Sequence, residues 1–477
     1  MIWKKCDKIN IAAKNFGLLA YCFLIVIVAL LGGNFTSPMQ PDSASYLNFY
    51  STRTSLYPFF LEIVLDGSNF YNLLMLIQLV VFLITFYLLI LAIKKAFVES
   101  TGLLHLFAIT YSLNVYLHSY HSQILSESIT FSVINILMLF FLMLTEKKSW
   151  KPILGVGFSV GMLVGLKPAM VFLLPVTAIL LPVIFFKKKR FFVNFLLIFL
   201  LGVSVPLVVE YKLYHVKYEQ RNSVLHLTTF GKAAIISTHP DFVIPKLPPK
   251  QNQWMLEIDQ AMEPFQAWKE TDPNIFVRGT VSSYLENMAQ YQLSDYIISK
   301  KNLPKLSRDE TLQLGLEVLR VNPGPFSKEI FTNFINMWGV GTIDFFAHHF
   351  AIKPPRLNSE LLDANVPKIG KEGLKYELFA KTSLFTFPGF LILGLITSFA
   401  WIISTIQLVS NNGKFNSLED EINFVFGSIV IAGVLFVAIA NIPTPRYLMP
   451  FFPMSLLMSM ISIGKLMGCC KKLLSAL

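Results

Sequence analysis

Five ionisable side chains lie close to long apolar segments of the sequence and are the first candidates for chemistry. They are Asp42, Arg53, Glu127, Lys167 and Arg446. A charged group within or beside a membrane is energetically costly, so such a residue is treated first as a functional candidate. Carboxylates can exchange protons, and arginine and lysine can bind anions such as phosphate.

Each of the five also has a simpler explanation. Asp42 can begin a turn or cap a helix, and Glu127 can lie in the first turn of a helix, where the dipole favours an acid. The three cations can anchor the chain at lipid headgroups. We expect all five on one face of the membrane, and four of them stand beside Pro or Tyr. This convergence favours a functional site.

Motifs of soluble enzymes are missing from the sequence. There is no P-loop, no Gly-rich dinucleotide-binding turn and no Gly-x-Ser-x-Gly elbow. His348 and His349 are adjacent, so they do not share a helix face as a metal-binding pair would. None of the four cysteines lies between residues 210 and 382, so we expect no disulfide framework there.

The elements that must position these residues are apolar helices. The 477 residues are 54% hydrophobic and 14% charged, whereas soluble domains are about a quarter charged. The sequence therefore predicts an all-α polytopic membrane protein with about ten transmembrane helices. They are expected at 16–33, 70–93, 101–119, 128–145, 152–166, 169–186, 191–209, 383–409, 422–442 and 447–464.

The distribution of charge predicts the orientation of these helices. The even-numbered helices end at lysine clusters or at the charged loop 411–421. Segments placed in the cytoplasm by this pattern hold seventeen basic and six acidic residues, an excess equal to the net charge of +11. The basic balance therefore indicates a positive-inside topology with both termini in the cytoplasm, and not a nucleic-acid-binding surface.

Two segments are expected to face outward. The first, 34–69, contains a predicted interfacial helix that begins at Tyr57 and Pro58. The second, 210–382, is a predicted mostly helical extracytoplasmic domain with a capping box from Ser307 to Glu310. The predicted organisation is thus a membrane domain over 1–209, a soluble domain over 210–382 and a second membrane domain over 383–477.

Four sequence segments together resemble the C superfamily of membrane glycosyltransferases. These enzymes include the bacterial aminoarabinose transferase, the protein mannosyltransferases and enzymes that modify O-antigen. The resemblance covers most of the chain in order, although the first loop contains no second Asp pair and Glu127 occupies the place of a second acid. The segments are PDSASYLNFYSTRTSLYP, GMLVGLKPAMVFLLP, LRVNPGPFSKEIFTNFINMW and PTPRYLMPFFP.

The resemblance implies an inverting glycosyltransferase that uses a sugar on a polyprenyl phosphate at the outer face of the membrane. Asp42 would be the general base. Arg53, Lys167 and Arg446 would bind the donor phosphate. Glu127 would be a supporting acid or would contact the acceptor or a metal. The acceptor would be an envelope glycan, lipopolysaccharide with its O-antigen, or a lipid.

Two other functions remain open at this point. A transporter or flippase for lipid-linked sugars would also need cations for the lipid phosphate, but such proteins usually contain internal repeats, and we find none. An O-antigen polymerase or ligase shares the expected topology. The sequence predicts no cofactor and leaves a divalent cation possible. A bacterial cytoplasmic membrane and separate donor synthase and flippase partners are implied by the resemblance alone.

Overall fold

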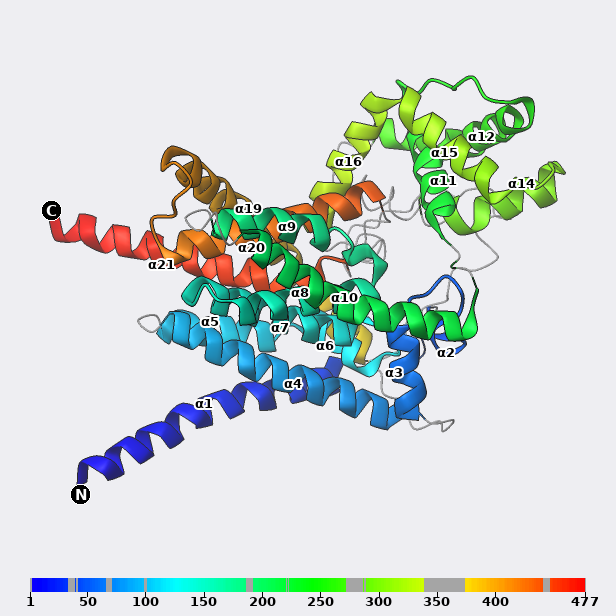
Figure 1. The fold of residues 1–477 in the computed structure, drawn as a ribbon. Helices are drawn as coiled ribbons and strands as arrows, with labels where there is room; N and C mark the ends of the chain where they lie inside the picture. Colours follow the sequence, from blue (N-terminus) through cyan, green and yellow to red (C-terminus); the bar gives the residue numbers. More distant parts are fainter. Residues whose placement is uncertain are drawn as a thin grey trace. The chain divides into compact units, whose positions relative to one another are not determined.

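The computed structural model shows an all-helical protein (Figure 1). The residues that it describes contain no β-strand. The described residues are 2–32, 39, 42–65, 71–97, 101–185, 192–219, 221, 223–271, 286, 289–338, 374–440 and 447–476.

The helices divide between two compact units. Unit 1 comprises residues 1–221, 393–433 and 449–477, and unit 2 comprises 222–392 and 434–448. The helices of the N-terminal half are α1 (Ile2–Gly32), α2 (Ser43–Leu47), α3 (Leu56–Leu65), α4 (Tyr71–Ala96), α5 (Thr101–Ser112), α6 (Val115–Ser119), η1 (Tyr120–Ser122), α7 (Glu127–Glu146), α8 (Trp150–Leu166), η2 (Pro168–Met170), α9 (Leu173–Ile184), α10 (Phe192–Lys217) and α11 (Leu225–Ile236). The later ones are α12 (Pro249–Thr271), η4 (Ala289–Leu293), α14 (Ser294–Lys301), α15 (Arg308–Val321), α16 (Pro323–Trp338), α19 (Leu374–Ser410), α20 (Leu418–Ala440), η6 (Met449–Phe451) and α21 (Phe452–Ala476).

Six of these helices are long and apolar enough to cross a membrane, which makes the chain an integral membrane protein. They are α4, α7, α10, α19, α20 and α21. The segments predicted at 16–33, 101–119, 152–166 and 169–186 also contain apolar helices, but shorter ones of 10–17 residues. Six candidate spans are therefore supported by length and composition among the described residues, and ten stays a prediction.

Several predicted helices, among them those observed as α1, α19 and α21, begin or end at other residues than expected. Two further differences concern α5 and α10. The segment 101–119 is not one helix, because α5 ends at Ser112 and the Asn114 side chain caps α6 by accepting from the Leu117 amide. An asparagine that binds its own backbone in this way competes with helix continuation. The helix expected to end at residue 209 continues as α10 to Lys217.

The helices of unit 1 pack closely where glycines face one another. α8 and α10 lie side by side (Figure 1). A Cβ atom added at Gly161 would lie 2.5 Å from the Val203 carbonyl oxygen, and one at Gly202 would lie 2.5 Å from that of Leu154. Only a residue without a Cβ permits this backbone approach, which is a common way for membrane helices to associate.

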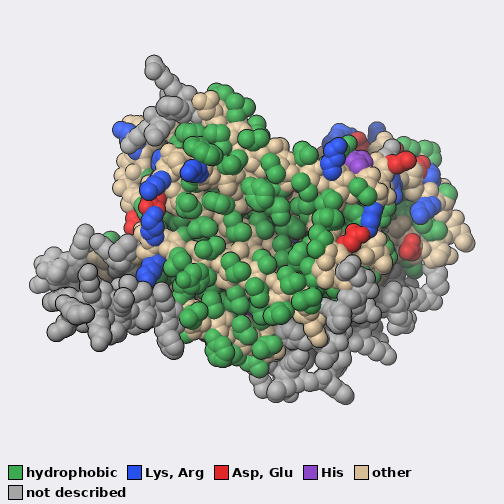
Figure 2. All heavy atoms as spheres, turned by 60° about the horizontal axis from the view of Figure 1, so that its bottom comes forward, with side chains coloured by type: hydrophobic (Ala, Val, Ile, Leu, Met, Phe, Trp, Pro, Cys, Tyr) green, Lys and Arg blue, Asp and Glu red, His purple; other side chains and the backbone are tan. Residues whose placement is uncertain are grey.

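Many of the exposed side chains of unit 1 are apolar. On α4, exposed residues recur every three or four positions, as at Leu76, Val80, Ile84 and Leu88. Figure 2 shows a continuous hydrophobic surface on the side of the molecule where α1 and α4 lie in Figure 1. A soluble monomer rarely exposes a patch of this extent, and contact with lipid accounts for it.

Unit 2 is a helical body with its own apolar core. Phe230 of α11 and Trp254 of α12 contact each other at its centre and are 1% exposed. The predicted capping box is present, since the Ser307 hydroxyl accepts from the Glu310 amide and the Glu310 carboxylate accepts from the Ser307 amide. α15 ends at Val321, and α16 begins two residues later at Pro323.

Candidate functional site

The segment from Asp42 to Tyr57 carries the first two candidate residues and brings them together. An Arg53 Nη atom donates to the Asp42 carboxylate at 2.6 Å, and Arg53 Nε donates to the Ser45 hydroxyl at 2.7 Å. The guanidinium also lies over the Tyr46 ring, 4.6 Å from its centroid. Asp42 immediately precedes α2 and pairs with the arginine eleven positions later. Both side chains remain about 30% exposed, at 32% for Asp42 and 27% for Arg53.

Hydrogen bonds hold this segment against the ends of α7 and α8. The Ser43 hydroxyl donates to the Ile124 carbonyl at 3.0 Å, and the hydroxyls of Tyr46 and Ser126 are 3.2 Å apart. The Thr54 hydroxyl donates to the Leu166 carbonyl at 3.0 Å. These contacts fix the Asp42–Arg53 pair beside the residues that precede Glu127 and Lys167.

Glu127 and Lys167 form a second, buried ion pair. Lys167 Nζ donates to Glu127 Oε1 at 2.9 Å, and the two side chains are 8% and 3% exposed. Glu127 is the first residue of α7 and Lys167 follows α8, so two helix ends meet here. Burial raises the pKa of Tyr57 well above its ordinary value, and the neighbouring Tyr46 and Glu127 raise this pKa further. Tyr57 also contacts the Tyr46 ring edge to face, with the ring centroids 5.1 Å apart.

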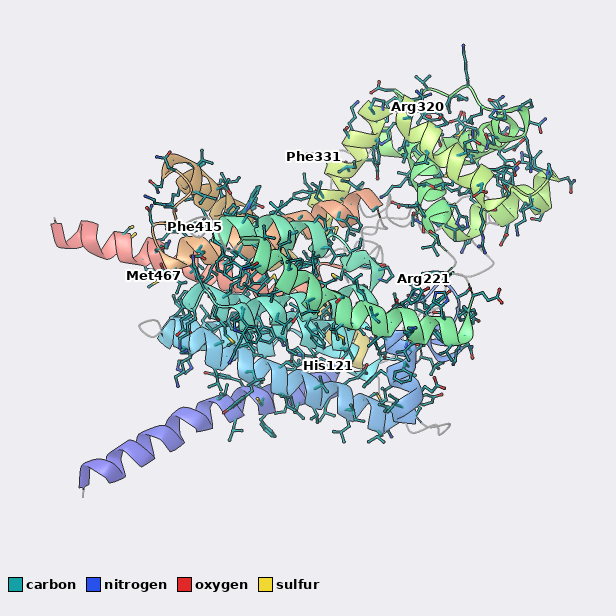
Figure 3. The ribbon with its side chains drawn as sticks, in the orientation of Figure 1. His121, Arg221, Arg320, Phe331, Phe415 and Met467 are labelled. Atoms are coloured by element: carbon teal, nitrogen blue, oxygen red, sulfur yellow. The ribbon has the colours of Figure 1, made fainter. Side chains whose placement is uncertain are left out.

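The C-terminal part of α10 anchors the same segment from another side. The Ser55 amide donates to the Glu210 carboxylate at 3.1 Å, and the Ser55 hydroxyl donates to the Glu210 carbonyl at 2.6 Å. Tyr214 donates to the Ser51 carbonyl at 2.7 Å, and Arg221 forms an ion pair with Glu210. Arg221 is labelled in Figure 3 near the end of α10.

One residue of this segment has a strained backbone. Phe49 adopts φ 45°, a left-handed conformation that is unusual for a bulky residue. Its ring is buried and makes edge contacts with Tyr214 and Tyr218, and its carbonyl accepts a hydrogen bond from Tyr218. Such strain persists only when the surroundings impose it, and it is frequent at functional sites.

A hydrogen-bonded chain of polar side chains extends from Ser128, next to Glu127, into the interior of unit 1. The Ser128 hydroxyl is 2.7 Å from His121 Nδ1, and His121 Nε2 is 3.3 Å from His118 Nδ1. The other nitrogen of His118 lies 3.0 Å from the Tyr111 carbonyl. All three hydrogen-bonding side chains are at most 1% exposed, and Figure 3 shows His121 among the helices.

The structure thus brings four of the five candidate residues into one region of unit 1. Asp42 pairs with Arg53, and Glu127 pairs with Lys167, with the segment 42–57 bonded to the ends of three helices. Arg446, like His348 and His349, lies outside the described residues.

Sequence reasoning missed the contribution of α10. Its predicted end at residue 209 placed Glu210 in a loop, whereas the carboxylate is buried in the site. The recurrence of Tyr211, Tyr214 and Tyr218 at spacings of three and four would have indicated that the helix continues with an aromatic face.

A metal site was left open by the sequence. In the described part of the chain, no group of three or more His, Cys, Asp and Glu side chains is placed to hold a metal ion. The carboxylates of Asp42 and Glu127 each accept a hydrogen bond from a cationic side chain. The chemistry available at the site is proton acceptance by a carboxylate next to cations that can bind an anion.

Comparisons with protein-family models, with curated proteins and with solved structures found no match to this chain.

Proposed function

We propose that this protein is an inverting glycosyltransferase that moves a sugar from a polyprenyl-phosphate carrier to an acceptor hydroxyl at the outer face of the membrane. The observation that carries the proposal is the docked segment 42–57. In it the carboxylate of Asp42 forms an ion pair with the guanidinium of Arg53. A second, buried ion pair joins Glu127 and Lys167 at the ends of membrane helices. The phosphate of a lipid carrier lies at the headgroup level of a bilayer, which is where we propose that these helix ends lie.

The proposed roles follow from the geometry of the two pairs. The acceptor hydroxyl attacks the anomeric carbon of the sugar, its proton passes to the Asp42 carboxylate, and the bond from that carbon to the phosphate oxygen breaks. Arg53 orients Asp42, because the guanidinium donates directly to the carboxylate. One displacement by one nucleophile inverts the sugar carbon.

The leaving phosphate gains charge in this step and needs cations close to it. We propose Arg53, which is bonded to Asp42, Lys167, which is paired with Glu127, and Arg446 as these cations. Glu127 holds Lys167 in place through the ion pair at 2.9 Å. It can release the lysine towards the phosphate or contact the acceptor or a divalent cation.

The acceptor and the setting belong to the same proposal. The acceptor is an envelope glycan, an O-antigen or lipopolysaccharide unit, or a lipid. The membrane is a bacterial cytoplasmic membrane with both chain termini inside. Nucleotide sugars do not reach that outer face, so a separate synthase and flippase would supply the donor.

The test is Asp42→Asn in purified protein assayed with a polyprenyl-phosphate sugar. Asparagine keeps the size of the side chain but cannot accept a proton. Loss of a general base lowers the rate by about 10²–10⁴, so transfer should fall by that factor while donor binding persists. The matched control is Glu62→Gln on α3, an exposed acid whose contact with Lys217 is 3.6 Å long, which should keep full activity.

Full transfer by Asp42→Asn would contradict the assignment of the base and most of the enzymatic proposal. A transporter is the second candidate, and the buried Glu127–Lys167 pair favours it, because paired charges at membrane depth also line transport pathways. A wild-type protein that moves the lipid-linked sugar across vesicles without transferring the sugar would establish transport.

A further inference from the structure

Unit 2 contains a buried charged cluster that the proposed chemistry does not use. Lys232 of α11 and Glu286 form an ion pair at 2.8 Å, with side chains 3% and 0% exposed. Lys232 Nζ also donates to the Ala438 carbonyl in the last turn of α20, at 3.1 Å. Gln290 donates to the other oxygen of Glu286 at 3.4 Å.

α16 adds a second acid and two amides to this cluster. His239 Nε2 lies 3.2 Å from Glu329, which is 2% exposed. Burial raises the pKa of Glu286 to about 7 against the opposing effect of Lys232, and Glu329 contributes to the rise. Glu329 therefore lies close to Glu286. Asn333 and Asn336 follow one and two turns later on the same face of α16.

Asn333 is the unusual member of the cluster. Its side chain is 0% exposed, and neither its amide nitrogen nor its carbonyl oxygen has a hydrogen-bond partner in the structure as described. Leaving such a buried group unpaired costs about 1–3 kcal/mol. By contrast Asn322, at the start of the same helix, bonds the backbone of Val243 in both directions and the Val318 carbonyl.

We infer that the face of α16 formed by Glu329, Asn333 and Asn336 is a binding site for the hydroxyl groups of a saccharide. A carboxamide presents an acceptor and two donors side by side, and neighbouring sugar hydroxyls present the complementary set. The proposed function makes the acceptor glycan the source of that saccharide, and in this respect the inference rests on it.

The charges of the cluster select an uncharged ligand. A phosphate or carboxylate ligand would meet two acids, Glu286 and Glu329, and one lysine that is already bonded to Glu286 and to a carbonyl. A cation would displace Lys232 from its two partners. Hydroxyl groups require neither change, because they can donate to Glu329 and exchange hydrogen bonds with Asn333.

The experiment measures saccharide binding to the full-length protein in detergent, by saturation-transfer NMR with four separate probes. The probes are D-glucose, D-galactose, N-acetyl-D-glucosamine and L-rhamnose. The variants are Asn333→Leu and Asn333→Ala, with Asn322→Ala as the matched control. Wild type should bind at least one probe, and both Asn333 variants should bind it at least about tenfold more weakly, the equivalent of one or two hydrogen bonds.

Thermal unfolding separates binding from support of the fold. Both atoms of Asn333 lack partners, so Asn333→Leu should unfold at the wild-type temperature or above it. Asn322→Ala should unfold at a lower temperature and keep the wild-type affinity for the sugar. The inference is overturned if wild type binds none of the probes, or if the Asn333 variants bind as wild type does. It is also overturned if Asn333→Leu destabilises as much as Asn322→Ala, since the amide would then serve the fold or an ordered water.

A parallel assay of sugar transfer keeps this inference separate from the proposed enzyme. Saccharide binding that depends on Asn333, in a wild-type protein without transferase activity, would support the site and reject the enzyme. Transfer activity with unaltered acceptor KM in the Asn333 variants would support the enzyme and reject the site.

Discussion

Arg53 contacts the side chains around it with almost every part of its guanidinium. It donates to Asp42 and Ser45 and lies over Tyr46, which fixes the plane of the group. Lysine could reach Asp42 but could not make these contacts together, because its ammonium is a single compact charge. The arrangement makes the position of the carboxylate depend on one side chain eleven residues away.

The buried Glu127–Lys167 pair leads to a prediction about stability. Removing one member leaves an uncompensated buried charge, which lowers the free energy of unfolding by about 3–5 kcal/mol. Replacing both members by apolar or neutral groups lowers it less. Lys167→Met should therefore unfold at a clearly lower temperature than the double variant Glu127→Gln/Lys167→Met. A double variant that is as unstable as the single one would show that the pair contributes little as a pair.

The pKa of Glu286 predicts how stability changes with pH. This pKa is about 7 in the folded protein against 4.5 ordinarily, so the folded protein retains a proton that the unfolded chain has released. The resulting stabilisation is present at low pH and is lost as the pH rises through 7. The groups facing Glu286 are Lys232, Glu329 and the neutral Gln290.

We therefore expect the unfolding temperature of wild type to fall between about pH 5 and about pH 8 more steeply than that of Glu286→Gln. Gln is the control because it keeps the shape and cannot titrate. Parallel pH profiles for the two proteins would mean that Glu286 keeps the same protonation state in the folded and unfolded chains.

At the scale of single elements, the contact between α8 and α10 holds two of the three helix ends that bind the segment 42–57. α8 contributes the Leu166 carbonyl and α10 contributes Glu210. The spacing between these ends depends on Gly161 and Gly202, where each helix approaches the backbone of the other. A change far from the charged residues should therefore alter the site.

Gly161→Ala should lower stability by about 1–3 kcal/mol, because the added methyl group meets the Val203 carbonyl and the helices must separate. Transfer activity should fall with it. Gly17→Ala in α1 is the control, since nothing lies within 4 Å of the added atom, and it should be neutral or slightly stabilising. Equal unfolding temperatures for both variants would refute the close packing.

The sequence predicted those elements whose signals are local. The capping box at Ser307 and Glu310 and the apolar run that became α4 each lie within one segment, so pattern alone identified them. The break at Asn114 was missed, because the side chain's preference for the backbone competes with an uninterrupted apolar pattern.

Four of the predicted candidate residues lie in one region of the structure, but the contacts that join them were not predicted. Ionisable groups beside apolar runs can be identified from composition. The pairing of Arg53 with Asp42 and of Lys167 with Glu127 depends on the tertiary packing of helix ends that are up to 40 residues apart. No local pattern encodes such contacts, and the strained φ of Phe49 has the same origin.

At the scale of the whole molecule, unit 1 has two chemically different ends. α7 is 20 residues long, beginning at Glu127 in the site and ending at Glu146, which pairs with Lys95 at 2.8 Å. Twenty helical residues span about 30 Å, the thickness of a bilayer core. The lysine-rich end and the Asp42 end would therefore lie on opposite membrane faces, which supports the orientation that we propose.

Reporter fusions test this orientation directly. A fusion at residue 300 should report the outer compartment, and a fusion at residue 477 should report the cytoplasm, because lysine-rich segments stay inside. The two positions thus act as controls for each other. The same compartment for both would reject the predicted helix map.

The anchoring of the segment 42–57 by α10 has a consequence for biosynthesis. Ser55 and Glu210 are separated by 155 positions and Phe49 and Tyr218 by 169, so the early segment leaves the ribosome long before its partners exist. Chains enter the membrane from the N-terminus while translation continues. The segment therefore cannot form these native contacts until α10 has been inserted. A ribosome-stalled chain that stops before residue 210 should leave Asp42 and Phe49 open to proteolysis, and one that extends into unit 2 should protect them.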